Sequence, residues 1–206
     1  MSMVGQLTYF LGLQVKQSAE GYFISQEKYA KNLIKKFELG SCKSPRTPIS
    51  TSTKLSKDYA GQPVDSTLYR SLIGSLLYLI ASQPNIMYCV GMCARYQSAP
   101  KESHLIAAKR ILKYVKGTVQ YGLWYSKESD ICLVAFCDTD WAGNVDDRKS
   151  TFGGCFFVGK NLVYWLSKKY NSISLSTADA EYIAAGGYCT QLIWIKQMLL
   201  DYGPSQ

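Results

Sequence analysis

The sequence predicts an α/β fold of the α+β type, in which a mainly helical region precedes a unit of strands and one helix. Three observations support this prediction. Apolar residues at helical spacing dominate up to about residue 118, strand-like runs gather after residue 121, and a long helical pattern covers about 177–202. We therefore expect two domains, 1–118 and 119–206. With 206 residues, 47% of them hydrophobic, the chain can bury a core in each.

The first elements are two strands and a helix. Residues 7–17 and 21–25 read as strands, and the polar residues 18–21 between them predict a hairpin. A helix is expected over 26–39, with Ser25 as its N-cap and Gly40 at its end. Its apolar stripe at a spacing of four consists of Tyr29, Leu33 and Phe37. Residues 41–63 are rich in Ser, Thr, Pro and Lys, which predicts a linker.

Three further helices are expected, over 65–81, 86–97 and 100–116, with Pro84 and Pro100 at their boundaries. The last of them carries basic residues beside its apolar face. These candidate nucleic-acid-binding residues are Lys109, Arg110, Lys113 and Lys116. A second basic group, between residues 28 and 36, surrounds the first helix. Each group is either an ordinary solvated helix face or a surface that contacts phosphates.

The strands of the second region are expected over 121–126, 131–137, 153–158 and 162–166, with a turn at 159–161. A helix then follows from about 177 to 202. Its predicted apolar face consists of Leu192, Ile195, Met198 and Leu199.

Charge and cysteine content limit the classes of function. The net charge of +8 favours a polyanionic partner such as nucleic acid, although many basic proteins bind nothing in particular. The seven cysteines include no CxxC pair, which predicts buried, reduced thiols in a cytoplasmic or nuclear protein. Because His104 is the only histidine, a zinc site and Cys–His or Ser–His catalysis are disfavoured. We expect no secretion signal and no membrane span.

Two carboxylates stand out as candidate catalytic residues and metal ligands. The apolar run 131–137 leads directly into Asp138, and the segment 175–185 places Glu181 in the first turns of a helix. Carboxylates held in this way can share a divalent cation such as Mg²⁺. The ordinary alternative is a strand-end Asp and a Glu that interacts with a helix dipole. Asp140 and Asp179 lie nearby in the sequence and could add negative charge.

Two other interpretations use the same segment. Asp138-Thr139-Asp140 matches the Asp-x-Asp metal motif of glycosyltransferases, but the helices before it do not form the strand–helix repeat that such enzymes need. Asn144-Val145-Asp146-Asp147 resembles the Tyr-x-Asp-Asp signature of polymerases without its tyrosine, so we expect a solvated acidic loop.

Several long blocks, in order, carry a resemblance to a known family. Residues 137–154, 162–169 and 172–185 read CDTDWAGNVDDRKSTFGG, LVYWLSKK and SISLSTADAEYIAA. Together they resemble the ribonuclease H domain of copia-type LTR-retrotransposon Pol polyproteins. The upstream blocks are LTYFLGLQVKQ (7–17), LYRSLIGSLLYL (68–79) and CARYQSAPKESHLIAAKRILKYVKGT (93–118). They resemble the C-terminal part of the reverse transcriptase, with its thumb and connection.

The resemblance implies an enzyme that copies RNA into DNA and degrades the RNA strand of RNA–DNA hybrids by two-metal hydrolysis. It also implies that this chain carries incomplete sites. Asp138 and Glu181 match the first two of four acidic positions, and the other two lie in family segments beyond Gln206. The polymerase aspartates lie in family segments upstream. We therefore expect weak or absent Mg²⁺ binding and no activity of the chain alone.

Two expectations about partners follow. The chain either has no activity of its own or is a non-catalytic protein, derived from the same element, that binds an RNA–DNA hybrid or other nucleic acid. In the ribonuclease H fold, further strands lie beside the first one. Residues 131–137 would therefore form an exposed apolar edge without those strands, and unpaired edges favour self-association.

Overall fold

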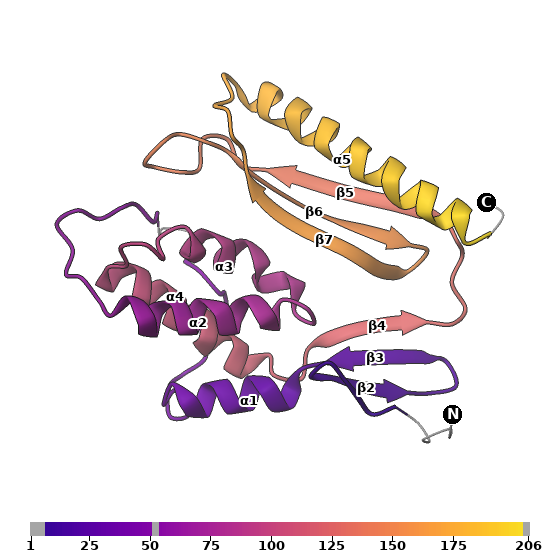
Figure 1. Cartoon of the computed structure of the whole chain (residues 1–206), viewed down its shortest axis with the longest axis horizontal. Coiled ribbons are helices and arrows are strands. Elements are labelled where there is room, and N and C mark those ends of the chain that lie inside the picture. Colours follow the sequence, from indigo (N-terminus) through magenta and orange to yellow (C-terminus); the bar gives the residue numbers. More distant parts are fainter. Residues whose placement is uncertain (1–6, 51–53, 204–206) are drawn as a thin grey trace. The chain divides into compact units, whose positions relative to one another are not determined.

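The computed structural model describes residues 7–50 and 54–203, and its helices and two antiparallel sheets confirm the α+β class (Figure 1). The chain divides into two units, Met1–Trp124 and Tyr125–Gln206, whereas the sequence placed the boundary after residue 118. Among the described residues, no helix is long and apolar enough to cross a membrane.

The sheet of the first unit has the order β1-β2-β3-β4, with β1 at Tyr9–Phe10, β2 at Leu13–Gln17, β3 at Gly21–Ser25 and β4 at Gly122–Ser126. The pairing of Gln17 with Tyr22 confirms the predicted hairpin between β2 and β3. The prediction of a single strand over 7–17 is wrong. Leu11 and Gly12 have φ values of 49° and 79°, so the chain reverses there. Positive φ at both central residues is typical of a tight type I′ turn.

The helix after β3 is α1, Glu27–Lys36, which is shorter than predicted. Ser25 is the last residue of β3, and Gln26 occupies the N-cap position, so the predicted Ser25 cap is wrong. Gln26 is buried, and its side-chain Nε2 donates to Tyr78 O (3.2 Å). The buried face of α1 consists of Ala30, Leu33 and Ile34, so Leu33 is the one member of the predicted stripe that is buried. Residues three and four apart share a helix face, which explains this set.

The three predicted helices of the first unit are confirmed as α2 (Ser66–Leu79), α3 (Met87–Ala94) and α4 (Glu102–Gly117). Asp65 caps α2, because its Oδ1 accepts a hydrogen bond from Thr67 N (2.8 Å). Pro84 begins a short 3-10 helix, η1 (Pro84–Ile86), that leads into α3. The core between these helices is fully buried; its large residues include Tyr69, Leu72, Ile73, Leu76, Ile111 and Leu112.

The second unit is a three-stranded sheet with one helix on one face (Figure 1). Its strands are β5 (Leu133–Thr139), β6 (Thr151–Val158) and β7 (Asn161–Lys169), in the order β5-β6-β7. The helix is α5, Thr177–Asp201. This is the predicted order of strands and helix, except that β4 joins the first sheet.

The core of the second unit lies between the sheet and α5. Phe156 of β6 is fully buried against Tyr188 and Ile195 of α5, and Leu192 and Leu199 pack against this cluster. The rings of Phe156 and Tyr188 are stacked at a centroid distance of 5.2 Å. Met198, predicted for the apolar face, is instead 37% exposed. The buried residues of α5, Ala180, Ala184, Tyr188 and Ile195, recur at the period of a helix.

Candidate functional site

Asp138 lies near the end of β5, opposite Gly153 of β6. Its side chain is exposed, and its Oδ1 accepts a hydrogen bond from Thr139 N (2.9 Å). Strand pairing with β6 therefore fixes the backbone on which this carboxylate sits. The other carboxylate oxygen, Oδ2, is available to solvent or to a ligand in the described part of the chain.

Glu181 lies on α5, close to its N-terminus, and is also exposed. Two hydrogen bonds define where this helix begins. Ser176 Oγ accepts from Asp179 N (3.1 Å), and Asp179 Oδ2 accepts from Leu175 N (2.9 Å). They satisfy N–H groups at the helix start that have no partner inside the helix. The position of Glu181 is thus determined by a well-formed cap.

The Cys137 thiol, next to Asp138 on β5, has a raised pKa. Its slight burial raises that pKa first, and the negative charges of Glu181 and Asp138 raise it further. Helix α5, which carries Glu181, packs against β5, which carries Asp138.

Cys137 itself was not predicted as part of this site, because the cysteines were expected to be buried thiols. All seven cysteines are free, but only Cys89 and Cys93 are buried. Burial raises the pKa of Cys89 to about 11 and that of Cys93 to about 12. The prediction of burial fails for Cys132, Cys137 and Cys189, which are exposed. An apolar run predicts a strand without indicating that the strand lies at the edge of its sheet.

The two neighbouring acidic residues, Asp140 and Asp179, accept hydrogen bonds from backbone N–H groups. Asp140 Oδ1 accepts a hydrogen bond from Thr151 N, and Asp179 caps α5 as described above. An added Cβ at Gly143 would be 2.2 Å from Asp140 Oδ2, so the loop after Asp140 folds closely around this carboxylate. Both residues therefore have a structural role, Asp140 in its loop and Asp179 at the start of α5.

The donor set does not fit a pair of magnesium ions. No group of three or more His, Cys, Asp or Glu residues in the described segments could hold a metal ion. Mg²⁺ requires near-octahedral coordination by oxygen, and a two-metal centre needs ligands for both ions. Asp138 and Glu181 alone supply two carboxylates.

The acidic loop at 144–147 has a structural explanation. Asn144 is buried, and its Oδ1 accepts from Asp146 N (2.9 Å) and Asp147 N (3.3 Å). Asp147 Oδ2 forms an ion pair with Lys169 Nζ at 2.6 Å. Partial burial acts to raise the pKa of Asp147, but the hydrogen bonds from Lys169 and Lys149 outweigh it and lower that pKa. These contacts tie the loop to β7.

The basic residues of α4 divide into two roles. Lys116 Nζ donates to Gly40 O (2.6 Å) and Cys42 O (2.7 Å), and Arg110 Nη2 donates to Thr47 Oγ1 (3.1 Å). Both residues therefore hold the segment after α1 against α4. Lys109 and Lys113 are half-buried on the same helix. Part of the predicted nucleic-acid-binding set thus has a structural role as well.

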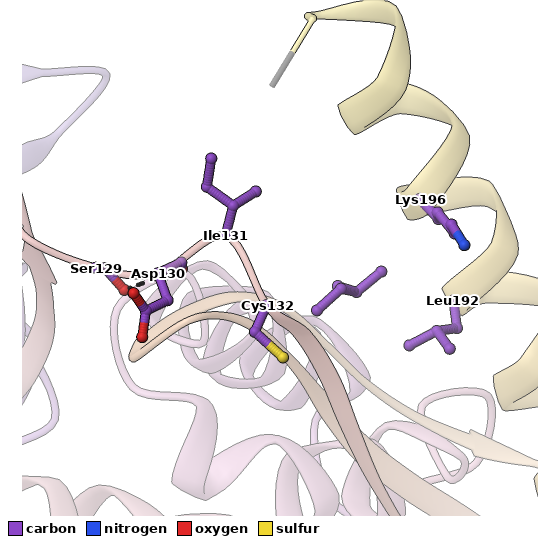
Figure 2. Close-up of a pocket in the computed structure, with 7 residues that line it drawn as sticks. Ser129, Asp130, Ile131, Cys132, Leu192 and Lys196 are labelled. Atoms are coloured by element: carbon purple, nitrogen blue, oxygen red, sulfur yellow. Dashed lines mark hydrogen bonds between the residues drawn. The ribbon is translucent and has the colours of Figure 1, made fainter. Parts of the chain in front are cut away.

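A pocket of about 790 Å³ lies elsewhere in the second unit, where the chain enters β5. Figure 2 shows Ile131 and Cys132 from the segment before β5, and Leu192 and Lys196 from α5. Asp138 and Glu181 are not among its lining residues. Its lining is mainly apolar, with Asp130 and Lys196 as its charged members, so it offers no cluster of catalytic groups.

Comparisons with known proteins identify relatives along nearly the whole chain. The uncharacterized mitochondrial protein AtMg00810 of Arabidopsis thaliana is 37% identical over 94% of this chain and 80% of its own length. The retrovirus-related Pol polyprotein from transposon RE2, also of Arabidopsis thaliana, is 34% identical over 96% of this chain. The corresponding Pol polyprotein from transposon TNT 1-94 of Nicotiana tabacum is 33% identical over 100% of it.

The chain spans only 14% of the RE2 polyprotein and 16% of the TNT 1-94 polyprotein. No family model matches the chain, and no solved structure matches it. The matched regions nonetheless cover both units. The chain belongs to the family of copia-type retrotransposon Pol polyproteins, and it corresponds to one segment of them.

Proposed function

We propose that this chain is the segment of a copia-type Pol polyprotein that joins the end of the reverse transcriptase to the start of its ribonuclease H domain. The observation that carries this proposal is the match of 96% and 100% of this chain to one segment of two transposon Pol polyproteins. In this role the first unit contacts template–primer, and the second supplies two of the carboxylates that would hold the metal ions for hydrolysis of the RNA strand of an RNA–DNA hybrid.

The described carboxylates are too few for turnover by the chain alone. Two exposed carboxylates favour weak capture of one divalent cation, because the remaining coordination positions would be filled by water. We therefore propose that the isolated chain binds Mg²⁺ weakly and does not cleave hybrids. Its free cysteines are consistent with a cytoplasmic or nuclear location.

The test is a cleavage assay on an RNA–DNA hybrid with labelled RNA in Mg²⁺, comparing the wild type with Asp138→Asn. We expect no cleavage that depends on Asp138. Binding of Mn²⁺, followed by electron paramagnetic resonance, should be weak and should disappear in Asp138→Asn and Glu181→Gln. Asp201→Asn is the matched control, because it removes an exposed carboxylate at the far end of α5. Cleavage abolished by Asp138→Asn would show that the isolated chain is an active nuclease.

A second candidate function is non-catalytic binding of nucleic acid. It is favoured by the net charge of +8 and by the basic residues of α1 and α4. Affinity for an RNA–DNA hybrid that falls steeply with salt would support it, because phosphate contacts release counterions. A chain that binds no hybrid at low salt would exclude it.

A further inference from the structure

A pocket in the first unit is lined by cations from two segments of the chain. It has a volume of about 520 Å³ and lies between α4 and the segment that follows α1. Arg110 and Lys113 line it from α4, and Lys43 and Arg46 line it from the other side. No acidic residue contributes to its lining. Four positive charges around one open pocket repel one another unless an anion lies between them.

The two sides of this cation pocket are held together by hydrogen bonds. Lys116 Nζ bonds two carbonyl groups, those of Gly40 and Cys42, just before the lining segment begins. Arg110 Nη2 bonds Thr47 just after it. Ser44 packs closely against Gly117, where an added Cβ would be 3.1 Å from Ser44 Cβ. The pocket is therefore preorganised, which reduces the entropic cost of binding a ligand.

Arg110 retains a donor without a partner. Its Nε is buried and forms no hydrogen bond with the described residues. A buried, unsatisfied donor on a charged group is costly. Neither of the ion pairs Lys31–Glu27 and Lys169–Asp147 involves one of the four cations. Guanidinium and ammonium groups together are suited to phosphate oxygens.

We propose that the cation pocket binds a phosphate group, and that this phosphate belongs to the backbone of a nucleic acid strand. The second clause rests on the nucleic-acid binding proposed above, and it names the subsite that performs it. The volume falls within the roughly 300–1,000 Å³ of typical ligand sites, which leaves space for an attached sugar. Lys43 and Arg46 join Arg110 and Lys113 in this site, while Lys109 and Lys116 lie outside it.

The test is fluorescence anisotropy with a labelled single-stranded oligonucleotide, using the full chain. Arg46→Gln and Lys113→Gln each remove one charge from the cation pocket, and Lys160→Gln removes one charge from the exposed turn between β6 and β7. Each pocket variant should weaken binding about five- to tenfold and reduce the slope of log K against log salt by about 0.7. Lys160→Gln should change affinity less than about twofold. Arg46 is exposed, so its substitution leaves the fold intact.

Inorganic phosphate, compared with chloride at equal ionic strength, separates the sources of the ligand. Competition between phosphate and the oligonucleotide at the wild-type pocket supports the proposal in full. Protection of the wild type, but not of Arg46→Gln, against thermal unfolding by phosphate, without any oligonucleotide binding, supports a free phosphate ligand and excludes the nucleic acid. Equal losses in Lys160→Gln and the pocket variants would overturn the proposal. The proposal also fails if neither pocket substitution changes the binding of phosphate or of the oligonucleotide, even where the wild type binds RNA–DNA hybrids.

Discussion

The hydroxyl of Tyr188 on α5 occupies the space that a side chain at Gly154 of β6 would need. A Cβ added at Gly154 would lie 1.6 Å from Tyr188 Oη and 2.0 Å from Cζ of the same ring. The ring is held in place by stacking on Phe156 and by an edge contact with Phe152. A glycine at this position therefore permits the close packing of α5 on the sheet that carries Asp138.

Gly154→Ala is expected to destabilise the second unit by about 2 kcal/mol, because overpacking displaces a ring that has no free space. Urea unfolding followed by tyrosine and tryptophan fluorescence measures the change. Gly153→Ala is the matched control, since the nearest atom to its added Cβ is Leu166 O at 3.7 Å, an ordinary contact. Equal stability of the two variants would contradict the packing described here.

Ser176→Ala should weaken the start of α5 and lower the free energy of unfolding by about 1 kcal/mol, because Asp179 N loses its partner. The substitution should also weaken Mn²⁺ binding, since Glu181 follows directly after the cap. Far-ultraviolet circular dichroism during urea unfolding measures the first effect. Ser172→Ala, at an exposed loop position, should behave like the wild type. An unchanged Ser176→Ala variant would show that the cap does not determine this helix end.

The ion pair between Asp147 and Lys169 should give a small, pH-dependent contribution to stability. The pKa of Asp147 is lowered from its ordinary value of 3.8, so the contribution is present above pH 3.8 and is lost as the pH falls through the folded-state pKa. Because the pair is partly exposed, Lys169→Met should lower stability by only about 0.5 kcal/mol at neutral pH. Lys168→Met, at the exposed neighbouring position, is the control. Stability curves against pH that stay parallel for all three proteins would argue against the pair.

Local signals in the sequence predicted most elements correctly. Residues 65–81 contain α2, Pro84 lies at the boundary before α3, and the apolar run before Asp138 forms most of β5, as expected. Such features depend on neighbouring residues alone. The reversal at Leu11 could not be predicted in this way, because leucine rarely adopts a positive φ. It is stabilised by Tyr78, whose hydroxyl donates to Leu11 O (2.7 Å) across 67 positions of sequence.

The candidate site likewise combines features that could be predicted from neighbouring residues with features that depend on tertiary contacts. The positions of Asp138 and Glu181 on a strand and a helix were predicted from sequence. That Asp140 and Asp179 are bound to backbone N–H groups could not be, because these bonds depend on how a loop folds. Likewise, the basic residues of α4 gave one uniform pattern, and only the tertiary contacts of residues 40–47 separate Lys116 from Lys113.

The edge strand β5 is expected to favour self-association of the chain. Within the described sheet β5 pairs only with β6, so its other edge is unpaired. Val134 and Phe136 on this strand are 37% and 60% exposed. The opposite edge strand, β7, ends in Lys168 and Lys169, whose charges discourage pairing, whereas β5 contains no lysine.

We therefore expect the average mass measured by light scattering to rise with protein concentration, and Phe136→Lys to reduce that rise by placing a charge on the β5 edge. Tyr182→Lys is the control, because Tyr182 is 85% exposed on α5 rather than on a strand. The expectation fails if the wild type remains a monomer with one cooperative melting transition. An equal effect of Tyr182→Lys would instead assign the association to α5, because exposed aromatic side chains on that helix could also drive it.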